Sequence, residues 1–243
     1  GPAAVRPCDG SRPAMNTLGT LTRPFVGPYL AGRAAATFGS ALLLTAVSWQ
    51  LYDQTRDAWS LGIMGLCNLV PWIGLTVPAG NLADRFARRD LSVFANLLLA
   101  AAAAGLVAAS YGQAQVVFVF GLLVAFGAAR ALGGTPMTAM LPQLVSAEQL
   151  IETTAWLLLS QQVAATLGPL FAGVFIRVRG DATLAYVVSA LSFVFAMLCF
   201  RRLPKIPQPQ SGARRGPQEL LAGFWFIYKT PVLFFSLEMT RDE

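Results

Sequence analysis

The sequence has no histidine, few charged residues and only three cysteines, and each scarcity excludes a class of protein. Without histidine, the usual general base, imidazole metal ligands and Ser-His nucleophile pairs are excluded. Charged residues make up 12% of the 243 residues, about half the share typical of soluble proteins, whereas 55% are hydrophobic. Cys8, Cys67 and Cys199 lack metal-ligand spacing, and we interpret them as packing thiols. We therefore expect no metal and no cofactor.

Long uncharged stretches separate the charges that are present, at residues 58–83, 91–129, 153–176 and 182–200. A bilayer core of about 30 Å needs about 20 helical residues. The apolar runs are continuous rather than alternating, which favours helices over barrel strands. This pattern predicts an all-α membrane protein with six transmembrane helices, near residues 30–52, 59–82, 91–111, 115–136, 151–176 and 182–200.

The segments around this bundle, which we place at residues 25–203, differ in composition. Residues 1–24 are rich in Gly, Pro and Ala and predict a disordered cytoplasmic N-terminus. Residues 204–218 predict a proline-rich cytoplasmic linker. Residues 219–243 predict an amphipathic helix and the truncated start of a seventh span, because the apolar run that begins at Pro231 soon meets charged residues.

The positions of Lys and Arg predict how the bundle is oriented, because cytoplasmic flanks of membrane helices carry an excess of these residues. The predicted spans place eleven of them on one side and three on the other. We therefore expect a plasma membrane or bacterial inner membrane protein with both ends of the bundle on the cytoplasmic side. The larger set contains Arg6, Arg12, Arg23, Arg85, Arg88, Arg89, Arg201, Arg202, Lys205, Arg214 and Arg215, and the smaller set contains Arg56, Arg177 and Arg179.

The most specific motif lies between the second and third spans and reads Gly80-Asn-Leu-Ala-Asp-Arg-Phe-Ala-Arg-Arg-Asp90. It resembles the signature of the major facilitator superfamily, Gly-X-Leu-Ala-Asp-Arg-X-Gly-Arg-Arg, with Ala87 in place of a glycine. We expect Gly80 to permit close helix contact, and Asp84 to pair with Arg88 one helical turn away. The resemblance implies one six-helix bundle of this superfamily, with a gating signature formed by Gly80, Leu82, Asp84, Arg85, Arg88 and Arg89.

Two further segments resemble elements of the same superfamily. Arg130 and Gly134 match an Arg-X-X-X-Gly element of the fourth span, whose embedded arginine is associated with proton coupling; a snorkelling or structural arginine is the alternative. Gly168, Pro169 and Gly173 are similar to the Gly-Pro-X-X-Gly-Gly element of exporters, with Ala172 in place of one glycine. Segments 141–150 and 220–226 are similar to the branch that includes the enterobactin exporter and related drug:proton antiporters.

Polar residues inside or beside the spans are the remaining site candidates. Helical spacing places them on single faces of the first and fifth spans, where they line either a cavity or a helix contact, and Arg33 has the further option of snorkelling. These residues are Arg33, Thr37, Ser40, Ser48, Thr154 and Gln161. Glu148 and Glu152 are the acids nearest the cytoplasmic gate, and we expect one of them to pair with the arginine cluster.

The resemblance implies a secondary active transporter that exports a small molecule by alternating access, driven by an ion gradient. The expected partners are the lipid bilayer, the cargo, protons, and the C-terminal six-helix half or a second copy, but not nucleic acid. The charges after Leu237 favour an alternative, a non-transporting truncated or regulatory membrane module. A membrane enzyme is disfavoured, because the spans lack embedded acids, histidines and metal-binding clusters.

Overall fold

The computed structural model describes residues 25–111, 116–144 and 147–204. Within these ranges all secondary structure is helical, in agreement with the predicted all-α fold. The predicted N-terminal segment, nearly all of the linker and the amphipathic helix lie outside the described residues. The helices are α2 (Val26–Thr55), α3 (Trp59–Arg85), α4 (Arg88–Tyr111), α5 (Val116–Leu144), α6 (Ala147–Arg179) and α7 (Thr183–Arg201).

Six described helices are long and apolar enough to cross a membrane, so the prediction of six spans is confirmed. The largest difference from the predicted boundaries is at the end of α5, which continues to Leu144 rather than ending near residue 136. The apolar part of α5 ends at Gly134. Beyond it, Met, Ala and Leu favour continued helix and outweigh the unfavourable effect of two prolines.

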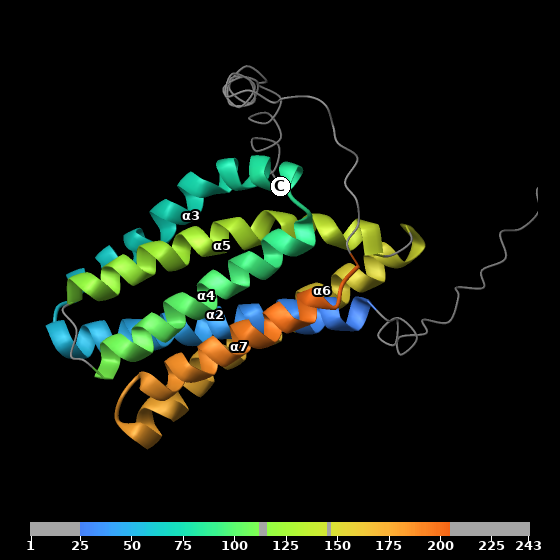
Figure 1. Ribbon diagram of the computed structural model, residues 1–243. Coiled ribbons are helices and arrows are strands. Elements are labelled where there is room, and N and C mark those ends of the chain that lie inside the picture. The colour runs from blue at the N-terminus through green and yellow to red at the C-terminus, as the bar shows by residue number, and fades with distance from the viewer. Residues whose placement is uncertain (1–24, 112–115, 145–146, 205–243) are drawn as a thin grey trace, which may run out of the picture.

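The helices pack in a pattern that is unchanged when the first three are exchanged with the last three. Helix α2 packs mainly on α6 and α7, α5 packs mainly on α3 and α4, and α4 also packs on α7. Exchanging α2 with α5, α3 with α6 and α4 with α7 reproduces these contacts, as expected for two related three-helix repeats. Helix α3 lies at one edge of the assembly (Figure 1).

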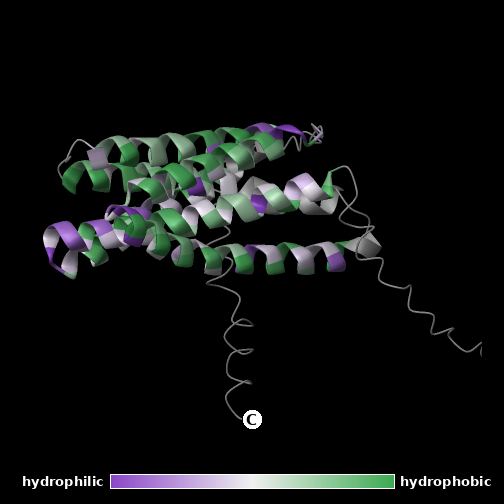
Figure 2. Cartoon of the chain, turned by 90° about the horizontal axis from the view of Figure 1, so that it is seen from below, coloured by the Kyte–Doolittle hydropathy of each residue, from purple (hydrophilic) through white to green (hydrophobic). Residues whose placement is uncertain are grey.

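Two apolar clusters hold the bundle together. The larger cluster joins α2, α4, α5 and α7, and includes the fully buried side chains of Leu43, Phe126 and Phe193. The smaller cluster lies where α2 begins and α7 ends, and contains Tyr29 and Phe200. Figure 2 shows hydrophobic residues along the whole length of the helices, with hydrophilic residues mainly near the helix ends.

Glycines allow two helix pairs to approach very closely. A Cβ atom added to Gly127 of α5 would collide with the backbone carbonyl of Asn68 in α3. A Cβ atom added to Gly168 of α6 would lie 2.6 Å from the Cβ of Ala41 and 2.9 Å from the backbone nitrogen of Leu42, both in α2. Small residues of this kind let membrane helices gain van der Waals contact along their backbones.

Helices α3 and α6 are the least covered by the rest of the chain. In the most apolar stretch of each helix, 11% of the residues are buried in α3 and 22% in α6, compared with 39–50% in the other described helices. The uncovered side of α3 includes Leu66, Val70 and Ile73. Both helices also contain internal prolines, Pro71 and Pro78 in α3 and Pro169 in α6.

The contact at Gly127 predicts a specific loss of stability. Gly127→Ala should reduce the free energy of unfolding by about 1 to 3 kcal/mol, because the added methyl group forces α5 away from α3. Gly121 is the matched control on the same helix, since a Cβ there meets no described residue within 4 Å. Gly121→Ala should be neutral or slightly stabilising, because alanine favours helix. Unfolding in mixed micelles measures both, and equal losses would contradict the prediction.

Candidate functional site

The predicted gating signature spans a sharp junction between α3 and α4. Helix α3 ends at Arg85, Phe86 has extended backbone with φ −108° and ψ 152°, and α4 begins at Arg88. The Phe86 amide still donates to the carbonyl of Leu82, at 3.0 Å. The signature therefore forms a helix end, a short connection and a helix start.

This junction corrects one expectation. Asp84 and Arg88 belong to different helices, so they are not one turn apart on a single helix. Their predicted pairing stays a prediction, because the side chains of Asp84 and Arg85 lie outside the described residues. A Cβ at Gly80 meets nothing within 4 Å among the described residues, so the close helix contact expected there also stays a prediction.

Ala87, which replaces the usual glycine of the signature, fits the junction without backbone strain. Among the described non-glycine residues, only Arg56 has a positive φ. The carbonyl of Ala87 accepts a hydrogen bond from the amide of Leu91, at 3.1 Å, and so begins α4. Alanine is therefore compatible with the conformation that the chain adopts here.

Two of the predicted cavity residues meet between α2 and α6. The Arg33 guanidinium donates from Nη2 to Oε1 of Gln161, at 3.2 Å, in a half-buried position. Arg33 lies about 10 Å along α2 from its first residue, a depth at which an isolated charge is unfavourable in hydrocarbon. The amide oxygen of Gln161 supplies an acceptor that lipid cannot provide.

The predicted hydroxyl residues donate to carbonyls of their own helices. The acceptors of Thr37, Ser40, Ser48 and Thr154 are the carbonyls of Arg33, Ala36, Leu44 and Leu150, at 2.6 to 2.9 Å. Ser48 also lies 3.3 Å from the sulfur of Met64 in α3. For Ser48 the geometry is that of a helix contact, which was one of the two alternatives.

Arg130 is the second arginine within a span. It lies in α5, half buried, four residues before the end of the apolar part of that helix at Gly134. In the described part of the chain, no hydrogen bond or ion pair joins Arg130 to another residue. Both embedded arginines lie toward the bundle end at which α2 begins, α4 begins and α7 ends.

The exporter-type element of α6 divides into a contact and an uncovered surface. Gly168 lies against α2, and Ala172, which replaces a glycine of the element, is fully buried. Pro169 and Gly173 are exposed, and in the described part of the chain a Cβ at Gly173 meets nothing within 4 Å. Only part of the element therefore serves packing within this bundle.

The acids predicted near the gate cannot both be placed. The side chain of Glu148 lies outside the described residues. Glu152 is half buried, and its Oε1 atom is buried without a hydrogen-bond partner among the described residues. Among the described residues, no ion pair joins Glu152 to Arg88 or Arg89.

Sequence reasoning missed a buried polar contact between α2 and α7. The Tyr186 hydroxyl donates to Oε1 of Gln50, at 2.6 Å, and both residues are buried. Asn96 of α4 is also fully buried, with its amide nitrogen donating to the carbonyl of Ser92. These residues carry the same signal as Arg33, a polar side chain in an apolar run. Their partners depend on how the helices pack.

Comparison with known proteins identifies the family. The profile of the Major Facilitator Superfamily matches residues 14–240. The chain belongs to this superfamily. It is 26% identical over 214 residues to proteins named enterobactin exporter EntS, from Citrobacter koseri, Shigella boydii and Escherichia coli. The aligned region covers 87% of this chain and 51% of each relative, so the chain spans about half the length of the curated relatives that it matches.

The hydrogen bond between Arg33 and Gln161 predicts energetic coupling. In a double-mutant cycle, Arg33→Gln and Gln161→Ala should be non-additive by about 0.5 to 2 kcal/mol in the free energy of unfolding. Thr37→Val with Gln161→Ala is the matched control pair, because Thr37 bonds to its own helix. That pair should be additive. Unfolding in mixed micelles measures both cycles, and additivity in the first would show that the contact adds nothing to stability.

Proposed function

We propose that this chain is the N-terminal half of a secondary active transporter that exports a small molecule by alternating access, driven by a proton gradient. The observation that carries the proposal is the superfamily match over residues 14–240 of a six-helix bundle. The alignment to proteins named as exporters favours export over uptake. The exporter-type element in α6 supports the same direction.

The uncovered sides of α3 and α6 support a second bundle as partner. These sides present exposed glycines and polar residues at membrane depth, including Gly65, Gly74 and Thr76 in α3 and Gln162 and Thr166 in α6. Small and polar residues are typical of helix–helix interfaces in membranes rather than of lipid-facing surfaces. A second six-helix half, or a second copy of the chain, would cover them.

The two embedded arginines are the residues that we assign to transport. In alternating access, two bundles rock around a central site near the middle of the membrane. Arg33 and Arg130 come from α2 and α5, which occupy equivalent places in the two three-helix repeats. We assign Arg130 to proton coupling, and Arg33 with Gln161 to the wall of the cargo pathway.

The proposal predicts gradient-dependent transport by the complete protein. In inside-out vesicles, an acidic interior should drive accumulation of at least one compound from a panel of small molecules. Arg130→Gln should lower that accumulation by about tenfold or more, because it removes the embedded charge. Arg177→Gln, an exposed arginine in the last turn of α6, is the control and should have little effect. Accumulation of no compound, or accumulation that ignores the gradient, would contradict antiport.

The arginine distribution predicts which end of the bundle faces the cytoplasm. Arg88, Arg89, Arg201 and Arg202 lie at one end of the helices, and Arg56, Arg177 and Arg179 at the other. In a background without the native cysteines, Arg201→Cys should react with a membrane-impermeant thiol reagent only after cells are opened. Arg56→Cys should react in intact cells. The reverse pattern would overturn the orientation and leave the fold unaffected.

A further inference from the structure

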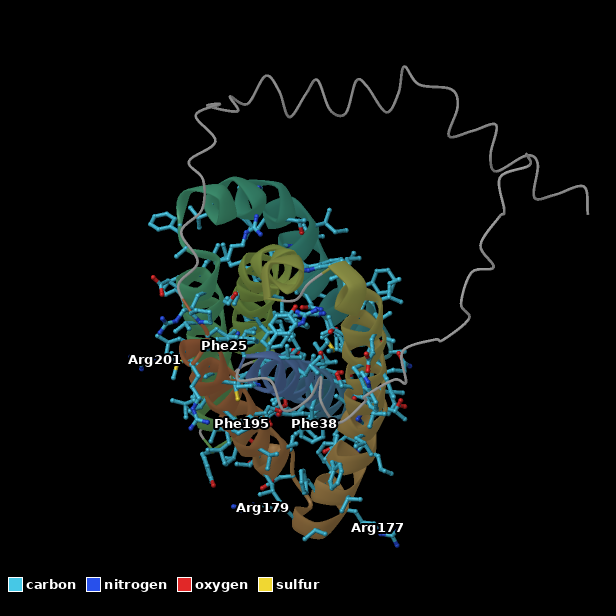
Figure 3. The ribbon with its side chains drawn as sticks, turned by 90° about the vertical axis from the view of Figure 1, so that its right-hand side faces the viewer. Phe25, Phe38, Arg177, Arg179, Phe195 and Arg201 are labelled. Carbon is cyan, nitrogen blue, oxygen red and sulfur yellow. The ribbon has the colours of Figure 1, made fainter. Side chains whose placement is uncertain are left out.

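Helices α2, α6 and α7 enclose an apolar groove of about 710 Å³. Helix α2 forms its floor, because α6 and α7 each pack closely on α2 but make few contacts with one another. Its walls include Trp156 and Val163 of α6 and Phe195 of α7, with Phe38 on the floor. Figure 3 shows Phe38 and Phe195 directed toward the space between α7 and α6.

The lining suits hydrocarbon rather than a polar solute. Its polar residues are Ser160 and Ser192. The Ser160 hydroxyl donates to the carbonyl of Leu157 at 2.9 Å, and the Ser192 hydroxyl donates to the carbonyl of Val188 at 2.8 Å. Both hydroxyl protons are therefore used within their own helices, and the remaining lining is aliphatic and aromatic.

Along α6 the groove is about as long as one leaflet is deep. It follows α6 from Trp156 to Leu167, a rise of about 16 Å, and half of the hydrocarbon core of a bilayer is about 15 Å. One turn beyond Leu167, the ring of Phe171 packs edge-on against Phe38 with centroids 5.8 Å apart. This aromatic pair bounds the groove on the α6 side.

Charged residues lie near the opposite end. Arg202, the residue directly after α7, follows Phe195 by two helical turns, about 10 Å further along the helix axis, and its helical backbone conformation continues the same face. Arg201 is adjacent, and both arginines are exposed. Glu152 lies one turn before Trp156 on α6. A headgroup that carries both a phosphate and a cationic group matches these charges.

We propose that the groove binds an acyl chain of a zwitterionic phospholipid, with the phosphate at Arg202 and the cationic end of the headgroup toward Glu152. The groove opens sideways between α6 and α7, so a lipid of the surrounding leaflet enters it without crossing the bundle. The bound acyl chain fills the gap between α6 and α7 and so links these two helices. The proposal depends neither on the cargo nor on which end of the bundle is cytoplasmic.

Native mass spectrometry of the complete protein tests this site. Delipidated protein titrated with dipalmitoylphosphatidylcholine should retain one tightly bound lipid per chain. Val163→Trp should weaken that binding by about tenfold or more, because tryptophan occupies the space of several methylene groups. Val174→Trp is the matched control on α6, since Val163 is 49% exposed and Val174 is 48% exposed but lies outside the groove. It should bind the lipid as the unmodified protein does.

A second variant tests the proposed contact between the lipid phosphate and Arg202. Arg202→Gln should lower the affinity for dipalmitoylphosphatidylcholine to that for dipalmitoylglycerol, which has the same chains without a phosphate. Circular dichroism and gel filtration establish that each variant is folded. Unchanged binding in Val163→Trp, or an equal loss in both valine variants, would overturn the site. So would failure of Val163→Trp to assemble, because the second six-helix half would then be the occupant.

Discussion

The whole structure depends on one constraint, that a polar group in hydrocarbon must find its partner within the protein. The backbone meets it by forming helices, and Thr and Ser hydroxyls meet it by donating one turn back along the same helix. Longer polar side chains need a neighbouring helix, which explains why Arg33 meets Gln161 and Tyr186 meets Gln50. These few contacts between helices fix how α2 sits against α6 and α7.

Close packing between helices determines which of their apolar surfaces meet. The hydrophobic effect does not distinguish a helix surface in lipid from one against another helix, so close fit decides which surfaces meet. Gly127 and Gly168 give that fit at α3–α5 and at α2–α6. Because the two pairs occupy equivalent places in the two three-helix repeats, the same close glycine contact occurs in both repeats.

The fold was predictable from the sequence because each span is a local property of one uncharged run. The superfamily was predictable from the order of residues 80–90, which the profile match confirms. The site was predictable only as candidates. Helical spacing selected Arg33 and Gln161 separately, but their meeting across 128 residues depends on packing. The break at Phe86 lies in the connection predicted between the second and third spans, but the expected one-turn spacing of Asp84 and Arg88 was wrong, because the chain leaves the helix between them.

The prolines of the edge helices affect how the bundle deforms. Proline has no amide hydrogen, so Pro71 and Pro78 each remove one backbone hydrogen bond from α3. Among the described helices, α3 is also the least buried. Bending of α3 therefore has a small free-energy cost. Helices α2, α4 and α7 resist bending because they pack around a shared core. The bundle is therefore easiest to bend along α3, the helix that the other described helices bury least.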